Sequence, residues 1–101
     1  MLLKRILAAL AATIACSAFG FTTPECKEIA ENVFAAQSIL NIDKSSLDET
    51  HAGVKATPAK ELGWSEEQKE KILAIVDSLK PGQDPQKVGM AVFNACRMSN
   101  V

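Results

Sequence analysis

The chain has 101 residues, of which 48% are hydrophobic, and a formal net charge of −1 at pH 7. Much of the hydrophobic excess lies in the first 20 residues; residues 21–101 carry 9 Lys and Arg against 12 Asp and Glu, a formal charge of −3. This length indicates a single small domain. The composition is too hydrophobic for a disordered acidic tail, and without a basic excess we expect no nucleic-acid partner.

Residues 1–20 have the three-part order of a cleaved secretory signal peptide. The first five residues form a short basic segment, the next ten are apolar apart from one threonine, and small residues follow. The apolar run is about half of the ~20 residues that a transmembrane helix needs, so we predict no stable membrane span. We therefore expect a periplasmic or secreted protein cleaved after Gly20, with cleavage after Ala18 as the alternative.

Cys16 leaves a second route of processing open. The segment that ends at Cys16 resembles the end of a bacterial lipoprotein signal, in which the cysteine becomes the lipid-bearing first residue. Thr13, however, stands where such signals usually carry leucine. We expect Cys16 to be a small residue of the cleavage region, and a lipid anchor on it is the alternative.

Either route leaves Cys26 and Cys96 as the only thiols of an exported chain, because Cys16 is either removed or lipidated. An even pair in an oxidising compartment predicts a disulfide. A bond across 70 positions would stabilise the fold by about 4 kcal/mol through loop entropy. A reactive or metal-binding pair is the alternative, but the chain has no Cys-x-x-Cys spacing and His51 is its only histidine, so we expect no metal and no cofactor.

Helix signals recur along residues 21–101. Three segments have apolar residues at three- and four-residue steps, as expected of amphipathic helices. Two of them follow an N-cap residue and a proline, at Thr23 and at Asp84, and the third follows a capping box at Ser65. In the less periodic segment between them, a capping box at Ser46 indicates a short helix that ends at Gly53. The predicted helices are 24–40, 47–52, 66–80 and 85–98, with a further short turn from Pro58 to Gly63.

No segment predicts a β-strand, because none alternates polar and apolar residues over more than four positions and no Asn-Gly or Asp-Gly turn is present. We predict an all-α fold, a small bundle of three main helices plus one short helix. The disulfide would join the first turn of the first helix to the last turn of the last helix and hold them antiparallel. Gly89, Ala91 and Ala95 predict a close approach of the last helix to a neighbour.

The sequence lacks the residues of the common catalytic motifs. It has no Gly-rich phosphate loop, no Gly-x-Ser-x-Gly, no His-Glu-x-x-His and no tyrosine. His51, oriented by a carboxylate of the segment Asp48-Glu49-Thr50-His51, is one candidate for a general base. A histidine in a polar turn is more often simply solvated, so we predict that the protein is not an enzyme.

Trp64 is the candidate partner-binding residue, since a tryptophan combines a large contact area with one polar group. Together with Leu62, His51 and Val54 it would form a recognition surface in the weakly periodic segment. The alternative is that Trp64 packs over the start of the helix 66–80 and covers the core.

These features predict a small exported helical protein that binds another protein of the cell envelope, as an inhibitor, immunity or accessory factor. A second hypothesis is an acid-stress chaperone, because the overall plan is similar to that of the small disulfide-clasped helical acid-stress chaperones of the bacterial periplasm. Neutralising 12 carboxylates at low pH would take residues 21–101 from −3 to about +10. That similarity is architectural and transfers no functional residue. A third hypothesis, a small-ligand or lipid carrier, requires a pocket between helices.

Overall fold

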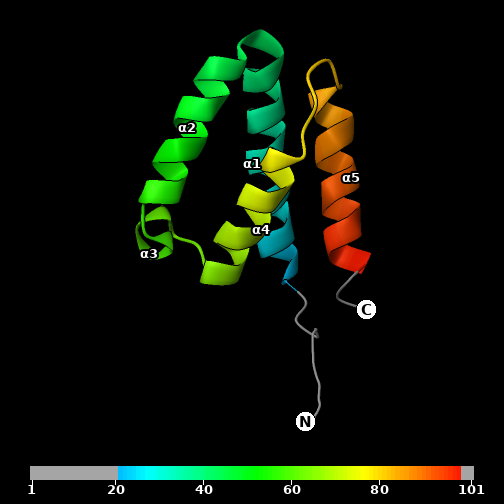
Figure 1. Cartoon of the computed structure of the whole chain (residues 1–101). Helices are drawn as coiled ribbons and strands as arrows, with labels where there is room; N and C mark the ends of the chain where they lie inside the picture. The colour runs from blue at the N-terminus through cyan, green and yellow to red at the C-terminus, as the bar shows by residue number, and fades with distance from the viewer. Residues whose placement is uncertain (1–20, 99–101) are drawn as a thin grey trace.

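Five helices and no strand make up residues 21–98, the part of the chain that the structure, a computed structural model, describes (Figure 1). The predicted all-α fold is confirmed. The predicted signal peptide and Cys16 lie outside the described residues. None of the helices in the described part is long and apolar enough to cross a membrane. The helices are α1 (Thr23–Ile42), α2 (Lys44–Ala56), α3 (Ala59–Leu62), α4 (Glu66–Asp77) and α5 (Pro85–Met98).

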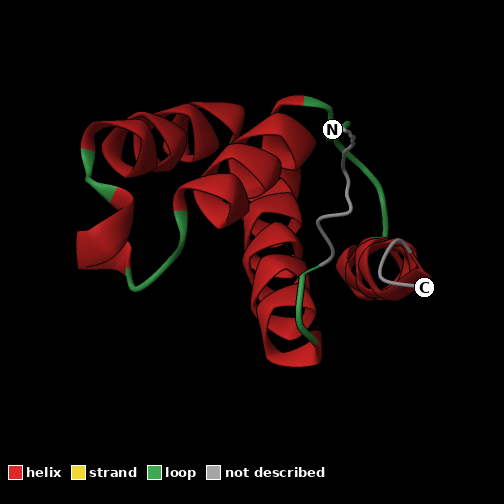
Figure 2. Cartoon of the chain, turned by 90° about the horizontal axis from the view of Figure 1, so that it is seen from below, coloured by secondary structure: helices red, strands yellow, loops and turns green. Residues whose placement is uncertain are grey.

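Helix α1 occupies the centre of the arrangement and contacts α2, α4 and α5. Helix α5 runs antiparallel to α1 along one side, while α2 and α3 lie on the opposite side (Figures 1 and 2). At close backbone distance, α5 has α1 as its only neighbour among the described helices. One long flank of α5 is therefore without a covering helix.

The start of α1 is determined by a capping box one residue before the expected position. Thr22 is the N-cap: its Oγ1 accepts a hydrogen bond from the Glu25 amide at 3.3 Å, and Glu25 Oε1 accepts from the Thr22 amide at 2.8 Å. The prediction of Thr23 as N-cap is wrong by one residue. Only Thr22 stands three residues before a glutamate, which is the spacing that this reciprocal pair requires.

Helix α2 is longer than the predicted helix 47–52. Its N-cap is Asp43, which accepts hydrogen bonds from the Ser45 amide at 3.2 Å and from the Ser46 hydroxyl at 2.9 Å. The predicted cap at Ser46 is therefore wrong, since that hydroxyl already donates to Asp43. Gly53 does not end the helix, which continues to Ala56.

The carboxyl end of α2 is held by a side chain from α4. Lys69 Nζ donates to the carbonyl oxygens of Lys55 at 3.1 Å and Thr57 at 2.6 Å. A cation at a helix carboxyl terminus pairs with unsatisfied carbonyl groups and with the negative end of the helix dipole. This long-range cap explains why α2 passes Gly53.

The remaining predicted starts agree with the structure, whereas one predicted end does not. Gly63, with φ of 77°, ends α3, and Ser65 caps α4 in a capping box with Gln68. Helix α5 has the predicted bounds. Helix α4, however, ends at Asp77 rather than near residue 80.

The segment after α4 is fastened to the end of α1. Gln37, fully buried on α1, donates from Nε2 to the Lys80 carbonyl oxygen at 2.9 Å. Asn41 accepts from the Gly82 amide at 2.8 Å and donates to the Gln83 carbonyl oxygen at 2.8 Å. These bonds fix the backbone of residues 80–83 beside the end of α1, and they lead the chain into α5.

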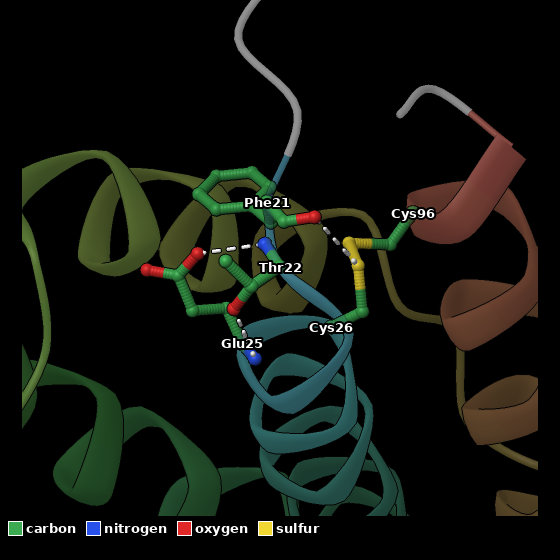
Figure 3. The surroundings of a disulfide bond; sticks show 5 residues. All are labelled: Phe21, Thr22, Glu25, Cys26 and Cys96. Carbon is green, nitrogen blue, oxygen red and sulfur yellow. Dashed lines mark hydrogen bonds between the residues drawn. A yellow bond between two sulfur atoms is a disulfide. The ribbon is translucent and has the colours of Figure 1, made fainter. Parts of the chain in front are cut away.

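The core lies on one face of α1 and includes the predicted disulfide. Cys26 and Cys96 are bonded, with 5.6 Å between their Cα atoms, and they join the first turn of α1 to the last turn of α5 (Figure 3). This pairing is confirmed. The buried core cluster consists of Cys26, Ile29, Val33, Ala36, Leu40, Leu47, Ile72, Val76 and Cys96.

Candidate functional site

An open groove of about 630 Å³ runs between α1 and α5. On each helix the lining positions recur at three- and four-residue steps, so they form one continuous helical face. From α1 these residues are Lys27, Ala30, Glu31 and Phe34, and from α5 they are Gln86, Gly89, Met90, Phe93 and Asn94.

The floor of the groove is made by small residues that bring the two helices together. A Cβ atom placed on Gly89 would lie 3.4 Å from Phe34 Cβ and 3.5 Å from the Ala30 carbonyl oxygen. The predicted close approach thus occurs at Gly89. Ala91 and Ala95 do not take part in it, since both are exposed.

Large apolar side chains stand along the groove and remain open to solvent. Phe34 is 44% exposed and Met90 is 60% exposed, and Phe93 between them is partly buried. Contiguous exposed apolar surface on a small domain typically marks a binding site. Two further exposed apolar residues, Ile42 and Met98, lie at helix ends and do not line the groove.

Two cations stand at the end of the groove nearest the disulfide. Lys27 lines the groove and Arg97 lies with its Cζ 5.8 Å from the centroid of the Phe93 ring. They directly follow the bonded cysteines in the chain, so one belongs to α1 and the other to α5; Arg97 is not itself a lining residue. Within the described residues, no carboxylate lies within ion-pair distance of either cation. Glu31, one helical turn from Lys27, is the carboxylate that lines the groove.

The groove was not predicted from the sequence, although a signal for it exists. Phe34 is one of the apolar residues of α1 that recur at three- and four-residue steps, yet its side chain is exposed. The apolar positions of α1 cover two adjacent faces: one buries Ile29 and Val33 in the core, and the other, one residue further round, exposes Phe34. An apolar stripe wider than one neighbouring layer can cover indicates a second contact surface.

The structure brings together three of the four residues predicted to bind a partner. His51, Val54 and Trp64 line a small cavity of about 90 Å³, together with core residues of α1, α2 and α4. Leu62 is partly buried on α3 and is not among the lining residues. Nothing in this arrangement tests whether a partner binds there, and that role stays a prediction.

Trp64 is held in place by polar contacts as well as by packing against the core. Its Nε1–H donates to Glu28 Oε2 at 3.0 Å, and Glu28 Oε1 accepts from Gln68 Nε2 at 3.5 Å. The three side chains tie α1 to the start of α4. This is the packing that the structural alternative for Trp64 describes.

His51 differs from the solvated histidine expected in a polar turn. It lies within α2 with its side chain only 13% exposed, and Nε2 is 3.0 Å from Asp77 Oδ1 on α4. The contact does not have hydrogen-bond geometry. The neighbouring carboxylate therefore comes from α4, and not from the adjacent residues of the chain.

Among residues 21–98, no three His, Cys, Asp or Glu side chains are grouped so that they could hold a metal ion. No protein-family model, no curated protein and no solved structure matches this chain.

Proposed function

We propose that this protein acts, without catalysis or a cofactor, by binding another protein of the cell envelope as an inhibitor, immunity or accessory factor. The observation that carries the proposal is the exposed apolar groove between α1 and α5, with Phe34 and Met90 open to solvent. Protein interfaces combine an apolar centre with a polar rim. The groove has this composition, since polar residues stand beside its apolar floor.

The groove is also rigidly built, which favours binding. The disulfide joins α1 to α5 at one end, and the hydrogen bonds of Asn41 fasten the chain at the other. A surface that is ordered before association loses less conformational entropy when it binds. A partner would therefore meet a preformed surface.

The proposed location, periplasmic or secreted, rests on the order of residues 1–20 and on the disulfide. Signal peptides lead to compartments in which disulfides persist. The buried Cys26–Cys96 bond is compatible with such a compartment.

Photo-cross-linking in intact cells tests the proposal. A photoreactive phenylalanine analogue replaces Met90 in the full chain, and in a matched control it replaces Ile42, which is 86% exposed but outside the groove. We expect one partner protein to cross-link from position 90 and not from position 42. Cross-links of equal yield from both positions, or none from position 90, would contradict the proposal.

A second pair of variants separates the groove from the surface predicted around Trp64. Phe34→Glu places a charge in the groove at a position that is 44% exposed, whereas Trp64→Phe changes the other surface while keeping an aromatic ring. We expect the cross-link from position 90 to disappear with Phe34→Glu and to remain with Trp64→Phe. Capture of many unfolded proteins only at about pH 3 would instead indicate an acid-stress chaperone.

Ligand carriage is the second candidate, because the volume of the groove lies in the range of small-molecule sites, about 300–1,000 Å³. Native mass spectrometry of the protein purified from cells tests this candidate. A bound small molecule that is lost in Phe34→Glu would support carriage, and a mass that matches the bare chain would count against it.

A further inference from the structure

We propose that the partner inserts an amphipathic helix into the groove between α1 and α5, with a carboxylate side chain of that helix seated between Lys27 and Arg97. The inference rests on the proposed function and specifies the recognised element. The binding mode is that of a helix in a groove, in which apolar side chains at helical spacing act as anchors.

The dimensions of the groove fit a short length of helix. From Lys27 to Phe34 on α1, and from Gln86 to Asn94 on α5, the lining spans about 10–12 Å at 1.5 Å per residue. This length corresponds to about two helical turns, which present three anchor positions. The small floor at Gly89 lets a ridge of apolar side chains enter between the two helices.

The position of the groove also favours a helix as occupant. The bundle covers α1 with α2 and α4 on its other faces, whereas α5 has α1 as its only close neighbour within residues 21–98. A third helix laid on the flank of α5 would complete the packing of the α1–α5 pair. Phe34 and Met90, both partly exposed, would then be covered from above.

Charge sets the orientation of the bound helix. Lys27 lines the groove from α1, Arg97 of α5 lies against the ring of Phe93, which also lines it, and neither cation has a carboxylate partner among the described residues. A carboxylate bound at this end would be attracted by both cations. At the other end the groove is lined by Gln86, an uncharged residue, so an acidic residue is favoured at one end only.

The same features argue against two other occupants. A lipid chain is normally held in a pocket that encloses most of its surface, whereas the side chains of Phe34 and Met90 leave this groove open. In a two-fold dimer with the two grooves antiparallel, the cationic end of one copy would face the uncharged Gln86 end of the other.

Two synthetic helical peptides serve as probes of this proposal. Both carry leucines at positions i, i+4 and i+7, and they differ only in one residue a helical turn beyond the leucines, which is glutamate in one and lysine in the other. We expect the oxidised full chain to bind the glutamate peptide roughly tenfold more tightly than the lysine peptide by isothermal titration calorimetry. High salt should reduce this difference.

Charge reversal in the protein provides the decisive variant. The double variant Lys27→Glu, Arg97→Glu should prefer the lysine peptide. A matched double variant, Lys60→Glu, Lys71→Glu, changes two exposed lysines outside the groove by the same total charge and should keep the original preference. Met90→Glu, at an exposed position that needs no repacking, should lower the affinity for both peptides at least tenfold.

Three outcomes would overturn the inference. Equal affinity for the two peptides, or a preference unchanged by charge reversal, would show that the cations do not orient a helix. Dimerisation of the free protein that Met90→Glu abolishes would assign the groove to a second copy. A co-purified lipid that blocks both peptides would assign it to ligand carriage. If the two peptides bind equally but the cross-link from position 90 to a partner protein persists, the proposed function stands and only recognition of an amphipathic helix is excluded.

Discussion

Trp64 and Glu28 are joined by a hydrogen bond of 3.0 Å between the indole Nε1–H and Oε2, although 36 positions separate them in the chain. The bond connects the segment before α4 to the first half of α1, where Gln68 shares the same carboxylate. Trp64, which the sequence analysis proposed as an anchor for a partner protein, thus has a hydrogen-bond partner within its own chain. Its structural role can be measured separately from any role in binding.

Removing the indole donor should destabilise the fold. For Trp64→Phe we expect the free energy of unfolding to fall by about 1–3 kcal/mol, because a partly buried hydrogen bond to a charged group is lost. Urea denaturation followed by circular dichroism measures this change. Glu28→Gln, which keeps an acceptor for the indole, should lower the free energy of unfolding by less than Trp64→Phe does. Unchanged stability in Trp64→Phe would contradict a structural role and favour the predicted binding role.

Loss of the disulfide should act on the whole fold and most strongly on α5. For the double variant Cys26→Ala, Cys96→Ala we expect a loss of about 4 kcal/mol in the free energy of unfolding, from the entropy of the opened loop. Because α5 packs closely on α1 alone among the described helices, its amides should lose protection from hydrogen exchange before those of α4. Equal loss of protection in both helices would contradict this order.

The two helical glycines should respond differently to alanine. A Cβ atom at Gly53 would meet no atom within 4 Å, so Gly53→Ala should stabilise α2 by about 1 kcal/mol through helix propensity. At Gly89 the new Cβ would lie 3.4 Å from Phe34 Cβ and 3.5 Å from the Ala30 carbonyl oxygen, at the close end of ordinary van der Waals contact, so part of the gain in helix propensity should be offset. We expect Gly89→Ala to change stability by less than about 0.5 kcal/mol. Equal increases in melting temperature for Gly53→Ala and Gly89→Ala would show that the contact between α1 and α5 at Gly89 is not tight.

The N-cap of α2 should make a pH-dependent contribution. Hydrogen bonds from the Ser46 hydroxyl, and then from the Ser45 hydroxyl and amide, lower the pKa of Asp43 from its ordinary value of 3.8. Because the pKa is lower in the folded state, the stabilisation is fully present above pH 3.8 and is lost as the pH falls through the lowered pKa.

Asp43→Asn, which retains a capping group without a charge, tests this dependence. The variant should be less stable than the wild type at neutral pH, and the difference should close as the pH falls below the lowered pKa of Asp43. Urea denaturation at a series of pH values gives the comparison, and NMR titration of the Asp43 carboxyl group gives its pKa. A difference that is the same at every pH would exclude the proposed hydrogen-bonded carboxylate.

The agreement between sequence and structure is best where the interactions are local. The capping box at Ser65, the glycine at the end of α3 and the proline after Asp84 all act within four residues, and the structure contains each of them as predicted. The start of α1 was misplaced by one residue because two adjacent threonines compete for the cap, and only Thr22 has a glutamate at the required spacing.

The disagreements arise from interactions between distant segments. Helix α2 continues past Gly53 because Lys69, from another helix, holds its last carbonyl groups. Helix α4 stops at Asp77 while Gln37 and Asn41 of α1 bind the backbone that follows. Local sequence signals do not predict such caps, since the caps depend on which helices become neighbours in the fold.

The amino-acid sequence is sufficient to predict the all-α class, the pairing of Cys26 with Cys96 and most of the helix starts. The reason is that helix periodicity and caps are local signals, and two cysteines leave a single pairing. The sequence does not predict which of the two apolar faces of α1 enters the core and which one, with Phe34, lines the groove with α5. That choice depends on the relative packing of helices far apart in the chain, and it created the surface on which the proposed function rests.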